Sequence, residues 1–259
     1  MEIRLFQIDA FSERLFSGNP AAVCPLDAWL DDDVLQKIAA ENNLSETAFF
    51  VKMGQGFHLR WFTPVCEVRL CGHATLASAH VLFHHLGYPG KEITFETLSG
   101  SLNVSRDGEW ISMDFPNQEP VPCAPPPRLL QAFGLSEAIC LKREDYFLIL
   151  ENEEAVVNAR PDLDGLRALD LRGVGISARG KSHDFVSRFF APKYGIDEDP
   201  VTGSAHTQLA PYWSKIIGRD ELLAKQVSKR GGEIKLRVSA ERVLISGKAV
   251  TYLAGTLSL

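Results

Sequence analysis

A glutamate stands at the start of an apolar segment in the sequence NLSETAFF, residues 43–50. Glu46 precedes the apolar residues 48–51, and carboxylates are rarely buried unless they are paired. A carboxyl serves as a general acid and base when apolar surroundings bring its pKa near the operating pH. Glu46 is therefore a candidate for proton transfer. The alternative is a glutamate at a strand entrance that bonds the nearby backbone of Ser45 or Thr47.

A histidine follows a glycine in the sequence CGHATLASA, residues 71–79. The run of small and apolar residues predicts a buried helix over 73–86. His73 would then lie in the first turn, near unpaired amide groups and the positive end of the helix dipole, which lowers the pKa of an imidazole. We expect a neutral ring that serves as a hydrogen-bonding partner or weak base. The alternative is a histidine that only caps or packs.

A second helix is expected to start in the sequence EDPVTGSAH, residues 198–206. Gly203 allows a ligand to approach the backbone closely, and Ser204 follows it. Two helix N-termini that face one cleft would bind an anion, and in a metabolic enzyme the expected anion is a substrate carboxylate. Asp199 would instead accept a hydrogen bond from a substrate amine or hydroxyl, or orient His73. The alternative for Asp199 is an ordinary Asp-Pro turn.

The elements that must position these residues occur twice along the chain. RWFTP (60–64) is similar to RFFAP (188–192), and CGHATLASA is similar to TGSAHTQLA (202–210). The alternating segments 99–113 and 231–245 follow at nearly the same offset. A tandem duplication and two similar lobes are predicted, over residues 1–117 and 118–259, with the last C-terminal residues able to join the first lobe.

Within each lobe, short strands are expected around a helix, an α+β arrangement. Acidic residues at the start and an apolar face predict a helix over 31–42. Strands bounded by turn residues are predicted at 2–9, 47–52, 57–62, 93–96, 101–105 and 110–115. The proline-rich segment 116–127 reads as the linker between the lobes.

Composition narrows the class of protein. The chain has 259 residues and a net charge of -6, without the basic patch that nucleic-acid binding requires. No signal peptide or membrane span is apparent. The glycine pairs at 54–56 and 173–175 lack the third glycine of a nucleotide-binding motif, so no cofactor is expected. The partner is expected to be a small molecule.

Cysteine and histidine spacing gives no metal site. His80, His84 and His85 are expected on the surface of the 73–86 helix, without a further ligand. Five scattered cysteines without a CxxC pair favour free thiols and a cytoplasmic location over disulfides: Cys24, Cys66, Cys71, Cys123 and Cys140.

Seven motifs in order along the chain resemble the PhzF-like proteins, a family named for phenazine biosynthesis. They are FSGNPAAVC, NLSETAFF, RWFTP, EVRLCGHATLASA, FAP, EDPVTGSAH and LAGTL, and they span residues 16–257. The resemblance implies the fold of diaminopimelate epimerase, in which two pseudo-symmetric lobes each wrap a mixed sheet around a central helix. It also implies a homodimer and a cofactor-independent isomerase acting on a small carboxylate-bearing substrate.

The resemblance also assigns roles to individual residues. It implies that Glu46 is a catalytic residue, together with His73 and Asp199 in the same site. It implies that the substrate is bound by Asn19 of GNPAAV, Gly72, Gly203 and Ser204.

Two alternatives stay open. Racemases, epimerases and dehydratases of the superfamily can use thiols, and Cys71 stands where the first thiol would be. Its repeat partner is Thr202, or Val201 if the alignment shifts by one, and neither is a thiol. The second alternative is a family member that binds a ligand or protein without catalysis, which the joint presence of Glu46, His73 and Asp199 disfavours.

Overall fold

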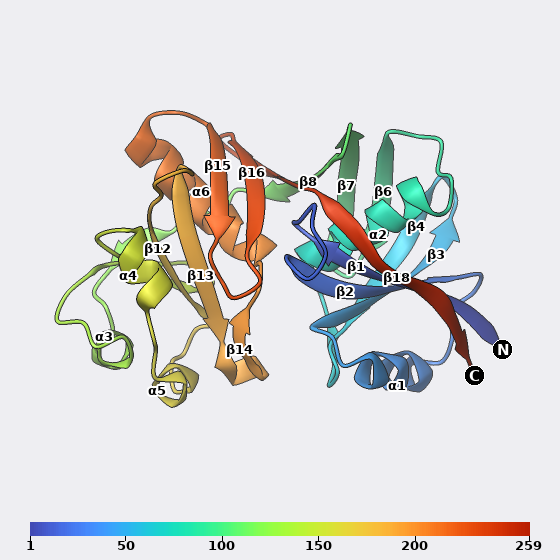
Figure 1. The fold of residues 1–259 in the computed structure, drawn as a ribbon, viewed down its shortest axis with the longest axis horizontal. Helices are drawn as coiled ribbons and strands as arrows, with labels where there is room; N and C mark the ends of the chain where they lie inside the picture. Colours follow the sequence, from blue (N-terminus) through green and yellow to red (C-terminus); the bar gives the residue numbers. More distant parts are fainter. The chain divides into compact units, whose positions relative to one another are not determined.

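A computed structural model describes residues 1–259, which divide into two compact lobes. The first lobe comprises residues 1–115 and 246–259, and the second comprises residues 116–245. Figure 1 shows the strands and helices of each lobe along the chain. None of the helices is long and apolar enough to span a membrane.

The first lobe is a mixed sheet with two helices. In it β1 pairs antiparallel with both β2 and β18, while β2 and β3 run parallel. The helices are α1 (Asp32–Asn42) and α2 (Gly72–His84). The strands are β1 (Glu2–Ala10), β2 (Asn19–Leu26), β3 (Glu46–Met53), β4 (Gly56–Phe62), β5 (Glu67–Val68), β6 (Glu92–Thr97), β7 (Gly100–Asp107), β8 (Trp110–Pro116) and β18 (Ala249–Ser258).

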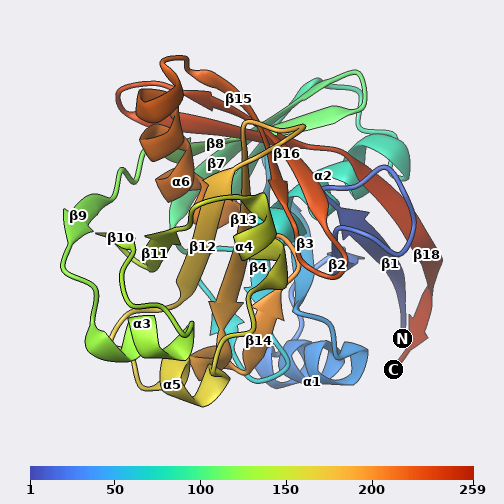
Figure 2. The same cartoon turned by 60° about the vertical axis from the view of Figure 1, so that its left-hand side comes forward.

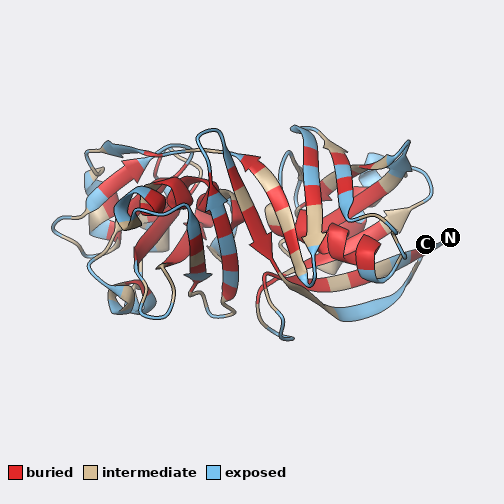
Figure 3. Ribbon diagram, turned by 90° about the horizontal axis from the view of Figure 1, so that it is seen from above, coloured by how far each residue is buried: buried red, intermediate tan, exposed pale blue.

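Helix α2 lies inside the first lobe. All residues from His73 to Phe83 are buried, and the helix contacts β1, β2 and β3. A helix that is apolar on all sides must be covered on all sides, and the small side chains Ala74, Ala77 and Ser78 let the strands approach. The buried residues of the central helices and inner strand faces are red in Figure 3.

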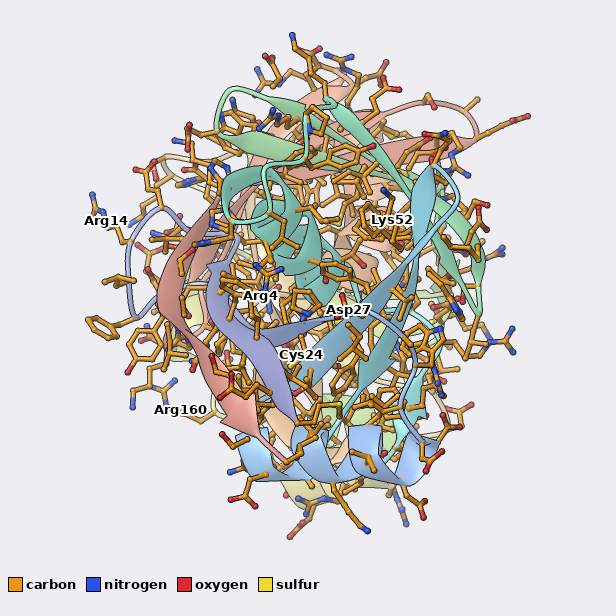
Figure 4. The ribbon with its side chains drawn as sticks, turned by 90° about the vertical axis from the view of Figure 1, so that its right-hand side faces the viewer. Arg4, Arg14, Cys24, Asp27, Lys52 and Arg160 are labelled. Carbon is orange, nitrogen blue, oxygen red and sulfur yellow. The ribbon has the colours of Figure 1, made fainter.

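Helix α1 covers a separate small core of the same lobe. Its residues Leu35 and Ile38 pack with Phe49, Phe62 and Cys24. Figure 4 shows Cys24 inside the lobe, whereas Arg14 lies at its outside. Burial raises the pKa of the Cys24 thiol to about 12, as expected for an inert packing residue.

The second lobe repeats the design with additional short helices. Its long helix α6 (Gly203–Ile217) contacts β15 and β16 (Figure 2). The short helices are α3 (Pro127–Ala132), α4 (Glu153–Asn158), α5 (Leu163–Arg167) and the 3-10 turn η1 (Pro192–Tyr194). The strands are β9 (Val121–Cys123), β10 (Ile139–Lys142), β11 (Tyr146–Ile149), β12 (Val174–Arg179), β13 (Phe185–Ala191), β14 (Ile196–Asp199), β15 (Glu221–Gln226), β16 (Gly232–Val238) and β17 (Arg242–Gly247).

Strand pairing follows the same pattern in both lobes. Strand β4 runs antiparallel to β3 and β5 and parallel to β6. Strand β13 runs antiparallel to β12 and β14 and parallel to β15. Helix α2 follows the short strand β5, which pairs with β4, and helix α6 follows the short strand β14, which pairs with β13. Strands β4 and β13 carry the repeated Arg-x-Phe motif. The repeat seen in the sequence therefore extends to the topology.

An arginine and a glutamate are paired at the same place in each repeat. Arg60 donates from Nε and Nη2 to the two carboxylate oxygens of Glu67, at 2.7 and 2.8 Å. Arg188 does the same with Glu198, at 2.7 and 2.9 Å. Each guanidinium also lies over the phenylalanine two residues on, at 5.1 and 5.0 Å from the ring centroid. The arginine of the repeated motif thus ties its strand to the segment that leads to the helix start.

The predicted elements of the first lobe are present within about two residues, while the strands β2, β5 and β18 are not among them. One expectation about α2 is wrong. His80 is not a surface residue, because only 8% of it is exposed and its Nε2 lies 3.1 Å from Thr251 Oγ1. His84 and His85 are exposed, as expected.

Candidate functional site

Glu46 is the first residue of β3. Helix α1 ends at Asn42, and its C-cap residue Asn43 has a left-handed conformation (φ 48°) that turns the chain toward the strand. Parallel pairing with β2 then places Glu46 opposite Ala21. The side chain of Glu46 is only 12% exposed. The sequence expectation of a carboxyl at the edge of a core is therefore confirmed.

The Glu46 carboxylate and the His73 ring lie against each other. Nε2 of His73 is 3.2 Å from Oε2 of Glu46. The other ring nitrogen, Nδ1, is 3.2 Å from Nδ2 of Asn19. The Asn19 amide donates to Nδ1, so the proton of the neutral ring lies on Nε2, the nitrogen that faces Glu46. Three residues that are far apart in sequence are thus brought into contact.

The imidazole of His73 is neutral over the ordinary pH range. Burial lowers its pKa from 6.5 to about 3, because a charged ring would lose its hydration. The predicted direction is confirmed, and the cause is burial of the ring. A neutral ring next to Glu46 leaves the charge of the carboxylate unpaired by a cation.

Cys71 is the N-cap residue of α2, and its Sγ lies 3.4 Å from His73 Nδ1. Donor atoms of Glu46, Cys71 and His73 all lie within 4.8 Å of one another. Oxygen, sulfur and nitrogen donors can together bind a transition metal. A metal at this place would use the Glu46 carboxylate and one nitrogen of the His73 ring as ligands. Cys71 can equally act as the partner of a neutral imidazole.

The second lobe has its own set of polar groups around the start of α6. Asp199 ends β14, and its Oδ2 accepts a hydrogen bond from Thr202 Oγ1 at 2.6 Å. Gln226 holds the same turn, because its Oε1 accepts from the Thr202 amide at 2.8 Å and its Nε2 donates to the Asp199 carbonyl at 2.7 Å. Thr202 is the N-cap of α6 and the counterpart of Cys71.

Ser204, in the first turn of α6, receives a hydrogen bond from an arginine. Arg172 donates from Nη2 to Ser204 Oγ at 3.0 Å and from Nε to Asp145 Oδ1 at 2.9 Å. Asp145 is fully buried, and Gln208 donates to its Oδ2 at 2.7 Å. A guanidinium only donates, so the hydroxyl of Ser204 keeps its own proton for another acceptor.

The structure thus places the predicted residues in two groups, each within one lobe. Asn19, Glu46 and His73 come together around the first residues of α2, which begins at Gly72. Asp199, Gly203 and Ser204 surround the first turn of α6. Four supporting residues were missed. No motif contains Asp145, Arg172 or Gln226, and Gln208 lies in TGSAHTQLA but carries no local sign of its role.

Comparison with known proteins decides the family. Residues 8–255 match the PhzC-PhzF family, described as phenazine biosynthesis-like proteins. The chain belongs to this family. A relative in Pseudomonas aeruginosa that is named an uncharacterized isomerase is 53% identical, and the alignment covers all of both chains. The crystal structure of a PhzF-family protein from Enterococcus faecalis is 46% identical, with full coverage of both chains and a TM-score of 0.98.

The fold extends beyond the PhzF family. A hydroxyproline epimerase from Agrobacterium vitis matches with a TM-score of 0.66 at 11% identity, covering all of this chain and 93% of that one. The α+β, diaminopimelate epimerase-like fold implied by the sequence motifs is confirmed. Together with the named isomerases among its relatives, this assigns the chain as a PhzF-family isomerase.

Proposed function

We propose that this PhzF-family isomerase moves a proton within a small carboxylate-bearing substrate, with Glu46 as general acid and base and without a cofactor. The observation that carries the proposal is the contact between Glu46 and a neutral His73, 3.2 Å apart and both largely buried. Proton transfer by a positioned carboxyl is typically worth about 10²–10⁴-fold in rate.

The neutral state of His73 matters for this chemistry. A protonated ring would form an ion pair with Glu46 and weaken it as a base. A neutral ring beside the carboxylate leaves its charge unneutralised, and the lone pairs of Glu46 can accept a proton from carbon. Glu46 would then return that proton to another atom of the same substrate.

Substrate binding is proposed for the two helix starts. Gly72 and Gly203 open α2 and α6, and amide groups in a first helical turn attract anions. Ser204 would donate its hydroxyl proton to a substrate oxygen. Asp199, as an acceptor, would contact an amine or hydroxyl of the substrate, and Asn19 would act through His73.

The proposal is tested by proton exchange with solvent. The purified protein is incubated in heavy water with a panel of small unsaturated carboxylates that carry amino or hydroxyl groups. The expected result is deuterium in one compound, detected by mass spectrometry and located by NMR. Binding of panel members without any deuterium uptake would instead support a ligand-binding protein without catalysis.

Cys71 favours a second candidate function, a thiol-dependent racemase, epimerase or dehydratase. The specific observation is its Sγ, 3.4 Å from His73 Nδ1. The corresponding residue of the second repeat is Thr202, which is bonded to Asp199, so a pair of thiols, one from each repeat, is not available. Racemisation of an amino acid in heavy water would identify this activity.

A homodimer in the cytoplasm is also proposed. Its support is the family resemblance and an exposed apolar area of the first lobe, where the ring of Phe16 lies 5.8 Å from that of Tyr252, next to Leu253. Light scattering coupled to gel filtration tests the dimer, and cell fractionation tests the location. A monomer at micromolar concentration would contradict the first proposal.

A further inference from the structure

Two cysteines of the second lobe lie side by side on neighbouring strands. Cys123 on β9 is the register partner of Cys140 on β10, and the strands are antiparallel. Their sulfur atoms are 3.4 Å apart. Directly opposed residues of an antiparallel pair have Cα atoms about 4.5–5.5 Å apart, which falls within the range of about 4.4–6.8 Å that a disulfide requires. The two thiols can therefore be joined without moving the strands.

The two thiols differ in accessibility. Cys140 is 3% exposed and belongs to a hydrophobic core cluster, whereas Cys123 is half-buried. Burial, followed by the hydrogen bond with Cys123, raises the pKa of the Cys140 thiol to about 12. A reagent from solvent therefore reacts with Cys123 first. The buried Cys140 thiol can then attack only the neighbouring Cys123 sulfur.

We propose that Cys123 and Cys140 form a two-thiol modification site that reacts with small disulfides such as oxidised glutathione and closes into a cross-strand disulfide. Neither the family assignment nor the proposed proton transfer involves this pair. The protein with both thiols reduced is modified, and the small disulfide is the oxidant.

The reaction proceeds in two exchange steps. The Cys123 thiolate attacks one sulfur of oxidised glutathione, forming a mixed disulfide and releasing one glutathione thiolate, which takes up a proton. Cys140 then loses its proton and attacks the Cys123 sulfur, and the bond to the second glutathione breaks. Two protein thiols are oxidised and one oxidised glutathione is reduced to two glutathione molecules. The high pKa of Cys140 makes the second step slow, and its proximity makes it intramolecular.

The bond would fix the segment between the two cysteines. This segment carries α3 and the side chains of Phe133, Leu135 and Ala138, which line a pocket of about 360 Å³ together with residues of β11 and α4. Closing a loop of this length constrains the unfolded chain. Oxidation should raise the melting temperature by roughly 5–10 °C in a chain of this size.

The test uses the full chain with Cys66→Ser, because Cys66 is exposed and would otherwise take up glutathione itself. The folded protein is incubated with oxidised glutathione and examined by intact mass and peptide mapping. The expected product has lost two hydrogen atoms, carries no glutathione, and contains Cys123 linked to Cys140. Dithiothreitol should reverse the change.

Single variants in the same background separate the two steps. Cys140→Ser should keep one glutathione on Cys123, since the second attack is impossible. Cys123→Ser should remain unmodified, since Cys140 is buried. Glutathione retained on Cys123 when Cys140 is present, or both thiols left free after prolonged incubation, would overturn the proposal. A lower melting temperature of the closed form would also contradict it, because the bond would then strain the strands.

Discussion

His73 Nε2 lies 3.2 Å from Glu46 Oε2, and this contact joins the first turn of α2 to the first residue of β3. The left-handed turn at Asn43 and the parallel pairing of β2 with β3 fix the glutamate. Burial keeps the imidazole neutral. A carboxylate and a neutral donor are thereby held together at the edge of an apolar core, which is an arrangement suited to moving protons.

The amide of Asn19 sets the tautomer of His73. Replacing it in Asn19→Asp places a carboxylate oxygen opposite Nδ1, so the ring proton should move from Nε2, which faces Glu46, to Nδ1. Turnover should fall by about 10–100-fold, as for other residues that orient a functional group. Nitrogen NMR of the His73 ring reports the tautomer directly. Unchanged ring signals in the variant would refute this role of Asn19.

The thiol of Cys71 separates the two candidate chemistries. If Glu46 transfers the proton, Cys71→Ser should retain activity within about tenfold, because the serine preserves size and hydrogen bonding near His73 and the lost thiol is not the base. The matched control is Cys24→Ser, a change at a buried thiol in the other core of the same lobe. Turnover of both variants is measured on the substrate found by exchange. A loss of several orders of magnitude in Cys71→Ser alone would favour the thiol-dependent reaction.

Arg172 and Asp145 form a partly buried ion pair that holds the start of α6. In Arg172→Met the fully buried Asp145 loses its cation, so the free energy of unfolding should fall by roughly 3 kcal/mol. Urea denaturation measures the change. The control is Arg237→Met, which breaks an exposed pair with Glu221 and should cost less than about 1 kcal/mol. Adding Asp145→Asn should recover part of the loss in the first variant, and no recovery would contradict the buried-charge explanation.

Buried histidines predict how stability depends on pH. Burial lowers the pKa of His206 to about 4, although the bond to the Thr202 carbonyl acts in the opposite direction. The unfolded chain binds a proton at this histidine below pH 6.5 and the folded chain only near pH 4. Stability should therefore fall as the pH decreases through this window, by about 1.4 kcal/mol per pH unit for this residue.

The variant His206→Asn isolates this contribution. Its free energy of unfolding, measured in urea at several pH values, should fall less steeply between pH 6.5 and 4 than that of the unchanged chain. Equal slopes for the two proteins would show that His206 is protonated in the folded state as readily as in the unfolded one.

The sequence was sufficient where neighbouring residues carry the signal. Glu46 and His73 were found because an apolar run and a helix start surround them, and the duplicated RxF motif predicted the matching topology of β4 and β13. Only the family resemblance pointed to Asn19, since a GNP sequence does not show which ring it will face.

Contacts between distant segments could not be predicted. Arg172 bonds Ser204 and Asp145 because the pairing of separate strands brings these residues together. No local sequence pattern predicts these bonds. The proximity of Cys123 and Cys140 depends on the register of β9 and β10. His80 was misplaced because a polar residue suggests an exposed face, while α2 is covered on all sides.

The most direct test of proton transfer by Glu46 is the rate of deuterium uptake from heavy water in Glu46→Gln. The amide keeps the size of the side chain and a contact with His73 but cannot accept a proton from carbon. Uptake should fall by at least about 10²-fold, while substrate affinity and melting temperature stay close to those of the unchanged chain. The control Glu41→Gln, at an exposed position of α1, should exchange at the normal rate. Full exchange in Glu46→Gln would contradict the proposed mechanism, and a collapsed melting temperature would make Glu46 a structural carboxylate.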